Sequence, residues 1–327
     1  MRMNFVSPRE RILYLKSMPT FSALPSSVLL PLAQALQEGF YSKGQTLIAV
    51  EWEIDEAHFL VSGSVDLYWQ DEKMRKIEAP WGVGFLGIFA QMQGGVRAVA
   101  TQDTRTLSIS RRDLEHVLSN NPKLLLANVS EFARRILAMR GGFPADPNTL
   151  PKPELGVYPE EPLAFVEQLL RFCRFPIFRS ANLDSLAELC HQQTERRCKP
   201  GDIIWRKGDA SDSNISLIHG IVQVDMEEGG PPMRIGAEYY LGMEGFAGLP
   251  RGYTLRCESD VVYLHTSMET FLGLLEDQFG LAMDLAKSFA QTVAGLTGDT
   301  AERSPQLEFA DRPVGAIFSR SQPPTVL

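Results

Sequence analysis

The sequence predicts two all-β barrels or jelly rolls in tandem, each flanked by helices, so the fold class is mainly β. Between about residues 39 and 110, short apolar runs alternate with turn signals, as in small antiparallel barrels. Apolar residues with helical spacing stand on both sides of that region. The whole pattern recurs in the second half of the chain, and a repeat of this length indicates two copies of one domain rather than a solenoid.

The first copy begins with helices predicted at about 8–19 and 26–38. In the second of these, Leu29, Leu32 and Leu36 are spaced as on one helix face. The clearest barrel strands are predicted at 45–50, 58–61 and 64–69. Helices are then predicted at 111–118 and 122–139, with Pro122 in the first turn of the longer one.

Residues 141–162 contain six prolines, so neither helix nor strand can persist there and a semi-rigid linker is predicted. The repeat follows without a gap between its anchors, because Gly44 recurs as Gly201 and Gly63 as Gly220, an offset of 157 residues in both cases. Its helices are predicted at about 163–173, 183–191, 267–275 and 278–296.

This organisation divides the chain into four predicted parts. The parts are a first domain at 1–140, a linker at 141–162, a second domain at 163–296 and a C-terminal tail at 297–327. The tail is rich in proline, serine and charge, so we expect it to be disordered or extended. Phe309, Ile317 and Phe318 can dock on a surface or remain exposed to solvent.

Composition limits the function. The chain of 327 residues is 44% hydrophobic and 22% charged, with a net charge of −8 and no dominant basic cluster, which disfavours DNA binding. The four cysteines all lie in the second half and form no Cys-x-x-Cys pair, so we expect reduced thiols, no structural zinc and a cytoplasmic protein. No run approaches the length of a membrane span, and the N-terminus lacks the apolar core of a signal peptide.

The stretch from Gly84 to Thr101 is crowded with glycines and contains one arginine, Arg97. Glycines allow sharp turns and close approach to a ligand, and free backbone N–H groups beside an arginine suit a phosphate. A similar stretch around residue 245 ends at Arg251. These are the two candidate ligand sites.

With these motifs the chain resembles the cyclic-nucleotide-binding domain family twice, over about 10–138 and 165–294. The matching segments, in order, are Phe21-Ser22-Ala23-Leu24, Lys43-Gly44, Pro200-Gly201, Gly63-Ser64-Val65 and Gly220-Ile221-Val222. The resemblance implies eight-stranded jelly rolls, each with a phosphate-binding cassette in which a Glu holds the ribose hydroxyl and an Arg the cyclic phosphate. It places the first cassette at Gly87, Ile88, Phe89, Ala90, Arg97 and Ala98, and the second at Gly242, Met243, Glu244, Arg251 and Gly252.

In this alignment the family carboxylate is replaced by Ile88 and by Met243, while both arginines remain. A buried ribose hydroxyl without its partner costs about 1–3 kcal/mol, which disfavours ordinary cAMP or cGMP in both domains. Glu244 follows one residue late and recovers the role only through a shift in register. A ligand with other sugar contacts, such as a cyclic dinucleotide, remains open, and so does the absence of any ligand.

The candidate site residues can also have purely structural roles. Arg97 and Arg251 can instead pair with carboxylates or carbonyl groups at a barrel mouth, and the glycines can serve tight turns alone. The five histidines fit no metal-ligand spacing and there is no Gly-x-Ser-x-Gly, so a metal site or an enzyme is disfavoured, a cupin-like enzyme ranking last.

The sequence therefore predicts a non-enzymatic cytosolic regulatory or adaptor protein. It would sense a cyclic nucleotide or cyclic dinucleotide, without other cofactor, and act through a protein partner. Arg97 would capture the phosphate, and the helix at 122–139 would then move over that pocket. The alternative is a ligand-free structural or assembly module whose barrels are protein-interaction surfaces. Self-association into a homo-oligomer stays open.

Overall fold

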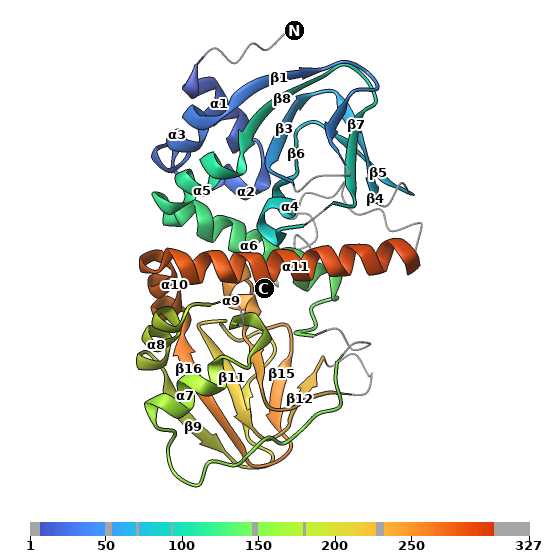
Figure 1. The fold of residues 1–327 in the computed structure, drawn as a ribbon. Coiled ribbons are helices and arrows are strands. Elements are labelled where there is room, and N and C mark those ends of the chain that lie inside the picture. The colour runs from blue at the N-terminus through green and yellow to red at the C-terminus, as the bar shows by residue number, and fades with distance from the viewer. Residues whose placement is uncertain are drawn as a thin grey trace, which may run out of the picture. The chain divides into compact units, whose positions relative to one another are not determined.

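Eight strands, β1 to β8, build the first barrel as two four-stranded antiparallel sheets (Figure 1). The computed structural model describes residues 7–49, 54–69, 72–92, 94–145, 150–178, 181–226 and 232–303. One sheet has the order β1-β8-β3-β6 and the other β2-β7-β4-β5. The strands are β1 Gln37–Tyr41, β2 Thr46–Ile48, β3 Glu56–Ser62, β4 Ser64–Trp69, β5 Glu72–Glu78, β6 Trp81–Val83, β7 Val96–Ala100 and β8 Thr104–Ser110.

The second barrel, β9 to β16, repeats these orders as β9-β16-β11-β14 and β10-β15-β12-β13. The offset of 157 holds inside the sheets, because Val65 pairs with Ala100 in the first barrel and Val222 with Cys257 in the second. The predicted mainly-β tandem fold is confirmed. The strands are β9 Thr194–Cys198, β10 Ile203–Trp205, β11 Ser213–His219, β12 Val222–Asp225, β13 Met233–Ile235, β14 Tyr239–Leu241, β15 Thr254–Cys257 and β16 Val261–Ser267.

The helices lie largely where apolar periodicity placed them. They are α1 Pro8–Lys16, α2 Pro19–Ser22, α3 Ser26–Ala35, α4 Phe85–Ala90, α5 Arg111–Ser119, α6 Pro122–Met139, α7 Phe165–Phe172, α8 Leu183–His191, α9 Met243–Ala247, α10 Met268–Asp277 and α11 Phe279–Arg303, with a 3₁₀ turn η1 at Pro176–Phe178. Among the described helices, none has the length and apolar character needed to cross a membrane.

Two predicted helix ends were wrong. Helix α3 stops at Ala35 rather than near residue 38, because Leu36 has extended backbone (ψ 139°) and leads directly into β1. Helix α11 continues to Arg303, past the predicted end at residue 296, so the first residues of the expected tail are helical. Phe309, Ile317 and Phe318 lie outside the described residues.

Two compact units divide the chain after Val117, whereas the sequence places the end of the first domain at residue 140. The first unit holds the described residues before this point together with those from Ala294 onward, and the second spans Leu118–Val293. Helix α6 packs against α9 and α10, which explains its place in the second unit. The other predicted domain boundaries, after residues 162 and 296, stay predictions.

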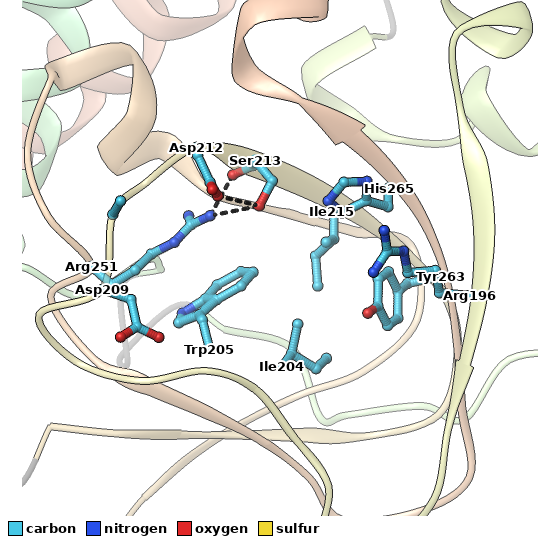
Figure 2. A pocket seen from close by; sticks show the side chains of 11 residues that line it. Arg196, Ile204, Trp205, Asp209, Asp212, Ser213, Ile215, Arg251, Tyr263 and His265 are labelled. Carbon is cyan, nitrogen blue, oxygen red and sulfur yellow. Dashed lines mark hydrogen bonds between the residues drawn. The ribbon is translucent and has the colours of Figure 1, made fainter.

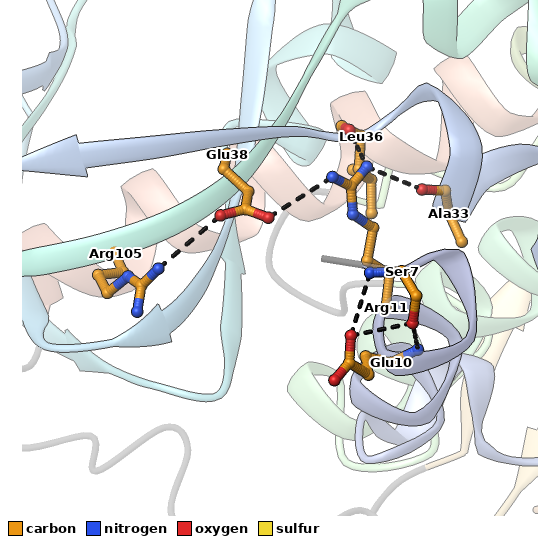
Figure 3. A network of polar contacts seen from close by, with 7 residues as sticks. All are labelled: Ser7, Glu10, Arg11, Ala33, Leu36, Glu38 and Arg105. Atoms are coloured by element: carbon orange, nitrogen blue, oxygen red, sulfur yellow. Dashed lines mark hydrogen bonds and ion pairs between the residues drawn. The ribbon is translucent and has the colours of Figure 1, made fainter. Parts of the chain in front are cut away.

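In the first unit, a polar network fixes α1 beside the barrel (Figure 3). Ser7 and Glu10 form a capping box at the start of α1. Arg11 donates to the carbonyl oxygens of Ala33, at 3.2 Å, and Leu36 at the end of α3. Its guanidinium also lies 3.6 Å from Glu38 on β1, which in turn faces Arg105 on β8 at 3.8 Å.

The described part of the predicted linker contains neither helix nor strand, yet it is tied to the second barrel. We call residues 150–163 the strap. Its Glu154 and Leu155 carbonyls accept from Ala237 (2.9 Å) and Gly220 (2.7 Å). A Cβ at Gly236 would lie 2.5 Å from the Glu154 backbone, so this contact requires glycine.

Just before the strap, the chain enters the core of the second barrel. Ala145 is 1% exposed, and Phe143 and Leu150 pack against the same cluster. That cluster includes Val222, Val224, Met233, Ile235, Trp205 and Tyr253. The second barrel therefore buries part of the predicted linker as its own core.

Candidate functional site

Both cassette helices begin directly after a glycine with left-handed backbone. Gly84 precedes α4 with φ 92°, and Gly242 precedes α9 with φ 115°. A Cβ at either position would lie 2.8 Å from backbone atoms of the adjacent strand, β3 or β11. The two barrels thus start their cassettes with the same strained turn, which only glycine adopts readily.

Strand pairing fixes the register of the two cassettes. Val83 pairs with His58, and Leu241 pairs with Ile215, the residue 157 positions after His58. Gly84 is therefore the counterpart of Gly242, and Phe85 and Leu86 are the counterparts of Met243 and Glu244. The predicted correspondence of Ile88 with Met243 was wrong by three residues.

The two arginines are not equivalent. Ala100 and Cys257 occupy matching ladder positions, so Arg97 corresponds to Thr254, and Arg251 corresponds to Gly94. Arg97 lies within β7 opposite Tyr68, with its guanidinium carbon 4.3 Å from the centre of that ring. The ladders therefore place Arg97 and Arg251 at different positions of their barrels, and phosphate binding by either residue stays a prediction.

The predicted first cassette is mainly a packing element. Gly87, Ile88, Phe89 and Ala90 are all buried in α4, and Ala98 is fully buried in β7. A Cβ at Gly87 would lie 2.3 Å from the Ile54 side chain. These residues present apolar surface to the barrel, so they offer no side-chain carboxylate to a ribose.

The second cassette brings Glu244 and Arg251 together. Glu244 Oε2 lies 3.6 Å from Arg251 Nη1, and the two side chains are only 3% and 1% exposed. Arg251 also lies over the Trp205 ring, 4.0 Å from its centre, and donates to the Ser213 backbone carbonyl and, at 3.2 Å, to its hydroxyl. The register shift that the sequence left open thus delivers a carboxylate beside the arginine.

Met243 and Gly252 frame this pair without adding polar side chains. Met243, which the sequence placed at the carboxylate position, is half-buried at the start of α9. Gly252 follows Arg251, and a Cβ there would lie 3.4 Å from the Gly142 carbonyl oxygen. The chemistry of the site therefore rests on Glu244 and Arg251.

The buried pair has hydrogen-bonding capacity to spare. Both carboxylate oxygens of Glu244, the Nε and Nη1 atoms of Arg251 and the Tyr253 hydroxyl have no hydrogen-bond partner among the described residues. Burial raises the pKa of Glu244, and the Arg251 charge opposes that rise. Buried polar groups are normally satisfied, so unsatisfied atoms gathered at one point mark a place suited to a polar ligand.

A pocket of about 380 Å³ opens beside Arg251 (Figure 2), a volume within the usual range for small-molecule sites. Its lining residues are Arg196, Ile204, Trp205, Asp209, Ala210, Asp212, Ser213, Ile215, Arg251, Tyr263 and His265. Glu244 and Arg251 were predicted site residues. Trp205, Ser213, Arg196 and His265 carried no local signal, because strands distant in sequence bring them together.

The first barrel has different side chains at the matching positions. The ladder counterparts of Trp205, Tyr263 and His265 are Ile48, Thr106 and Ser108. Leu86 and Gly94 stand in place of Glu244 and Arg251. The same topology therefore carries the buried acid–arginine pair in the second barrel and other side chains, without that pair, at the matching positions of the first.

Helix α6 contacts the second cassette directly. Arg134 Nε donates to the Ala247 carbonyl oxygen at 2.8 Å, at the C-terminal end of α9. The sequence instead expects this helix to respond to a phosphate at Arg97. Its contacts with α9 and α10 link it to the cassette of the second barrel.

Comparison with known proteins identifies the second barrel. Residues 195–278 match the family described as the cyclic nucleotide-binding domain. A search of the curated proteins finds no match. The matched range contains Glu244, Arg251 and the described pocket lining.

The solved structures that match this chain include parts of regulatory proteins. The regulatory subunit of a cAMP-independent protein kinase A from Trypanosoma brucei shares 14% identity, covering 85% of this chain and 89% of that chain at a TM-score of 0.35. The regulatory domain of protein kinase A from Toxoplasma gondii, crystallised with cAMP, shares 12%, covering 84% and 96% at 0.34. The N-terminal domain of a transcriptional regulator from Streptomyces coelicolor shares 20%, covering 40% and 96% at 0.36.

The predicted family resemblance is thus confirmed where the family model matches, at residues 195–278. The first barrel lies outside that match and has the same strand order as the second.

Proposed function

We propose that this chain is a non-enzymatic regulatory protein of the cytoplasm whose second barrel binds a nucleotide second messenger. Arg251 would hold the phosphate and Glu244 the ribose hydroxyl. The observation that carries this proposal is the buried Glu244–Arg251 pair with unsatisfied polar atoms, of which Arg251 lines a pocket of about 380 Å³.

The chemistry of the pair suits a ribose phosphate. An arginine guanidinium donates to phosphate oxygens through a planar fork, and a carboxylate accepts from hydroxyl groups. Arg251 has Nε and Nη1 to donate, and Glu244 has two acceptor oxygens. Trp205 holds the guanidinium in place by stacking, which lowers the entropy lost on binding.

The first barrel would serve as a structural partner rather than a sensor. Its cassette offers Leu86 and Gly94 where the second has Glu244 and Arg251. Arg97 would then stabilise the barrel surface through its contact with Tyr68.

Helix α6 would transmit the effect of ligand binding from the second cassette to a partner. A ligand held by Glu244 acts on the first turns of α9, and the other end of α9 accepts from Arg134 of α6. A change in the position of α9 would therefore alter this hydrogen bond and the α6 packing. A protein partner that contacts α6 would read the change.

Thermal unfolding of the full chain with cAMP, cGMP, cyclic di-GMP and cyclic di-AMP tests the proposal. A ligand at about 100 times its Kd should stabilise the protein by roughly 2.7 kcal/mol. The stabilisation should vanish in Arg251→Gln and in Glu244→Gln and persist in the matched control Arg97→Gln. Circular dichroism at the assay temperature establishes that each variant is folded. A stabilisation that survives both second-barrel substitutions, or none with any nucleotide, contradicts the proposal.

A second candidate is a ligand-free assembly module. Phe143, Ala145 and Leu150 already pack in the core of the second barrel, next to Tyr253 and close to Gly252. On this account the barrel interior is filled by its own chain, and the protein works through its surfaces. Complexes with a partner or a second copy would then form equally well with and without nucleotide, as light scattering would show.

A further inference from the structure

The pocket of the second barrel has two ends with different exposure. Arg251 lies at a buried end and is 2% exposed. Arg196, at the other side of the same pocket, is exposed to solvent (Figure 2). It pairs across the β9–β16 ladder with Tyr263, and His265 lies two residues further along β16. We call Arg196, Tyr263 and His265 the mouth residues.

The pairing of Arg196 is that of its backbone in the β9–β16 ladder, and its side chain forms no hydrogen bond or ion pair with another described residue. Its neighbour Arg197 points differently and is occupied, with Glu195 at 2.9 Å and the Tyr158 hydroxyl at 3.2 Å. Adjacent strand residues face opposite sides of a sheet, so only Arg196 is turned to the pocket.

We infer that Arg196 reads the base of the bound nucleotide and selects guanine over adenine. This inference rests on the proposed function, because a phosphate held at Arg251 directs the rest of the ligand toward the mouth. Guanine presents two acceptors, O6 and N7, on the edge that an arginine fork binds with two hydrogen bonds. Adenine presents a donor, N6–H₂, beside N7, and that donor opposes the guanidinium.

The charges of the whole pocket lining favour one phosphate over two. Asp209 and Asp212 line the pocket on the Arg251 side, away from Arg196 (Figure 2), so the lining sets two carboxylates against two arginines and opposes a second anion. Burial, followed by the Arg196 charge, lowers the pKa of His265, so this imidazole adds no positive charge at neutral pH. One phosphate at Arg251 and one uncharged acceptor edge at Arg196 therefore fit the lining better than two phosphates do.

Titration calorimetry of the full chain with cGMP and cAMP tests the inference. The wild type should bind cGMP about tenfold to a hundredfold more tightly than cAMP, the discrimination expected of a bidentate arginine contact. Arg196→Met keeps the aliphatic stem and removes the fork. It should weaken cGMP to the level of cAMP and leave cAMP unchanged. The matched control, Arg197→Met on the opposite face of β9, should keep the preference.

Other results overturn the inference in distinguishable ways. Equal binding of cGMP and cAMP that still depends on Arg251 defeats base reading and leaves the proposed function intact. Equal weakening of both ligands by Arg196→Met makes Arg196 a general cation. Tighter binding of cyclic di-AMP than of cGMP, lost in Arg196→Met, assigns the mouth to a second phosphate. Failure of every nucleotide to bind removes the proposed function, and the inference falls with it.

Discussion

The two barrels share every strand pairing of their sheets and differ at the cassette. Both begin the cassette helix with a left-handed glycine, Gly84 or Gly242. From there the first barrel supplies apolar packing, whereas the second supplies a buried carboxylate and arginine. Topology therefore depends on backbone pairing and one glycine, and binding chemistry depends on a few side chains that the topology leaves free to change.

The largest expected effect is the loss of one member of the buried ion pair. Arg251→Gln leaves Glu244 buried without its counter-charge, and such a change costs about 3–5 kcal/mol. Arg97 is half-exposed, so Arg97→Gln leaves no buried charge unpaired and should cost less than Arg251→Gln does. Urea unfolding followed by tryptophan fluorescence measures both.

The double variant Glu244→Met with Arg251→Met is the control for the Arg251→Gln substitution. Replacing both members of a buried ion pair with apolar residues is often neutral or stabilising, so much of the lost stability should return. If the double variant is as unstable as Arg251→Gln, the cost does not arise from an unpaired charge.

The next largest effect concerns the strap, whose backbone hydrogen bonds to Gly220 and Ala237 tie it to the second barrel. Gly236→Ala places a methyl group 2.5 Å from the Glu154 backbone and should destabilise by about 1–3 kcal/mol. The ladder counterpart in the first barrel is Glu78, which already carries a side chain. Limited proteolysis should cut the strap faster in this variant.

Gly273→Ala provides the comparison for that substitution. Nothing lies within 4 Å of a Cβ at Gly273, in the middle of α10, so alanine should stabilise the helix by about 0.5–1 kcal/mol. Equal proteolysis of the strap in the two glycine variants and the wild type would argue against a tightly held strap.

A third effect separates the barrels by how they secure their first strand. Glu38 in the first barrel faces Arg11 and Arg105, whereas its counterpart Glu195 accepts from the Leu163 backbone at 2.8 Å. Arg11→Met should cost about 1–3 kcal/mol in the first unit, because it removes the donor to two α3 carbonyls. Hydrogen exchange should accelerate in α1 and β1 and stay unchanged in β9.

The smallest effect depends on pH. His58 is fully buried in β3, and burial lowers its pKa below the ordinary 6.5, with Glu56 opposing the shift. The unfolded chain therefore binds a proton more readily than the folded chain, so stability is lost as pH falls below about 6.5.

Replacement by the residue of the second barrel, His58→Ile, should remove this part of the acid sensitivity. The difference in unfolding free energy between variant and wild type should grow from pH 7 to pH 5. A difference that stays constant over this range would mean that His58 does not titrate below its ordinary pKa in the folded state.

The tandem jelly rolls could be predicted from the sequence because the same turn glycines recur at a constant offset. Gly44 and Gly201, and Gly63 and Gly220, lie 157 residues apart at matching turns, and apolar spacing located most helices. These signals are local or periodic, so they can be recognised in the sequence without knowledge of tertiary contacts.

The cassette register could not be settled in the same way. Gly84 and Gly87 both lie in the first candidate stretch, and only the pairing of Val83 with His58 selects Gly84 as the counterpart of Gly242. The spacing between glycine and arginine gave no guide either, because Arg97 follows Gly84 by 13 residues and Arg251 follows Gly242 by 9. Trp205 and Arg196 join Arg251 through folding of distant strands, which no local pattern reports.

The central claim is that the second barrel alone binds the nucleotide. Titration calorimetry of the full chain with cyclic nucleotides measures the number of sites directly. The account predicts one site per chain, lost in Arg251→Gln and unchanged in Arg97→Gln. Two sites per chain, or a single site that disappears in Arg97→Gln and persists in Arg251→Gln, would contradict it.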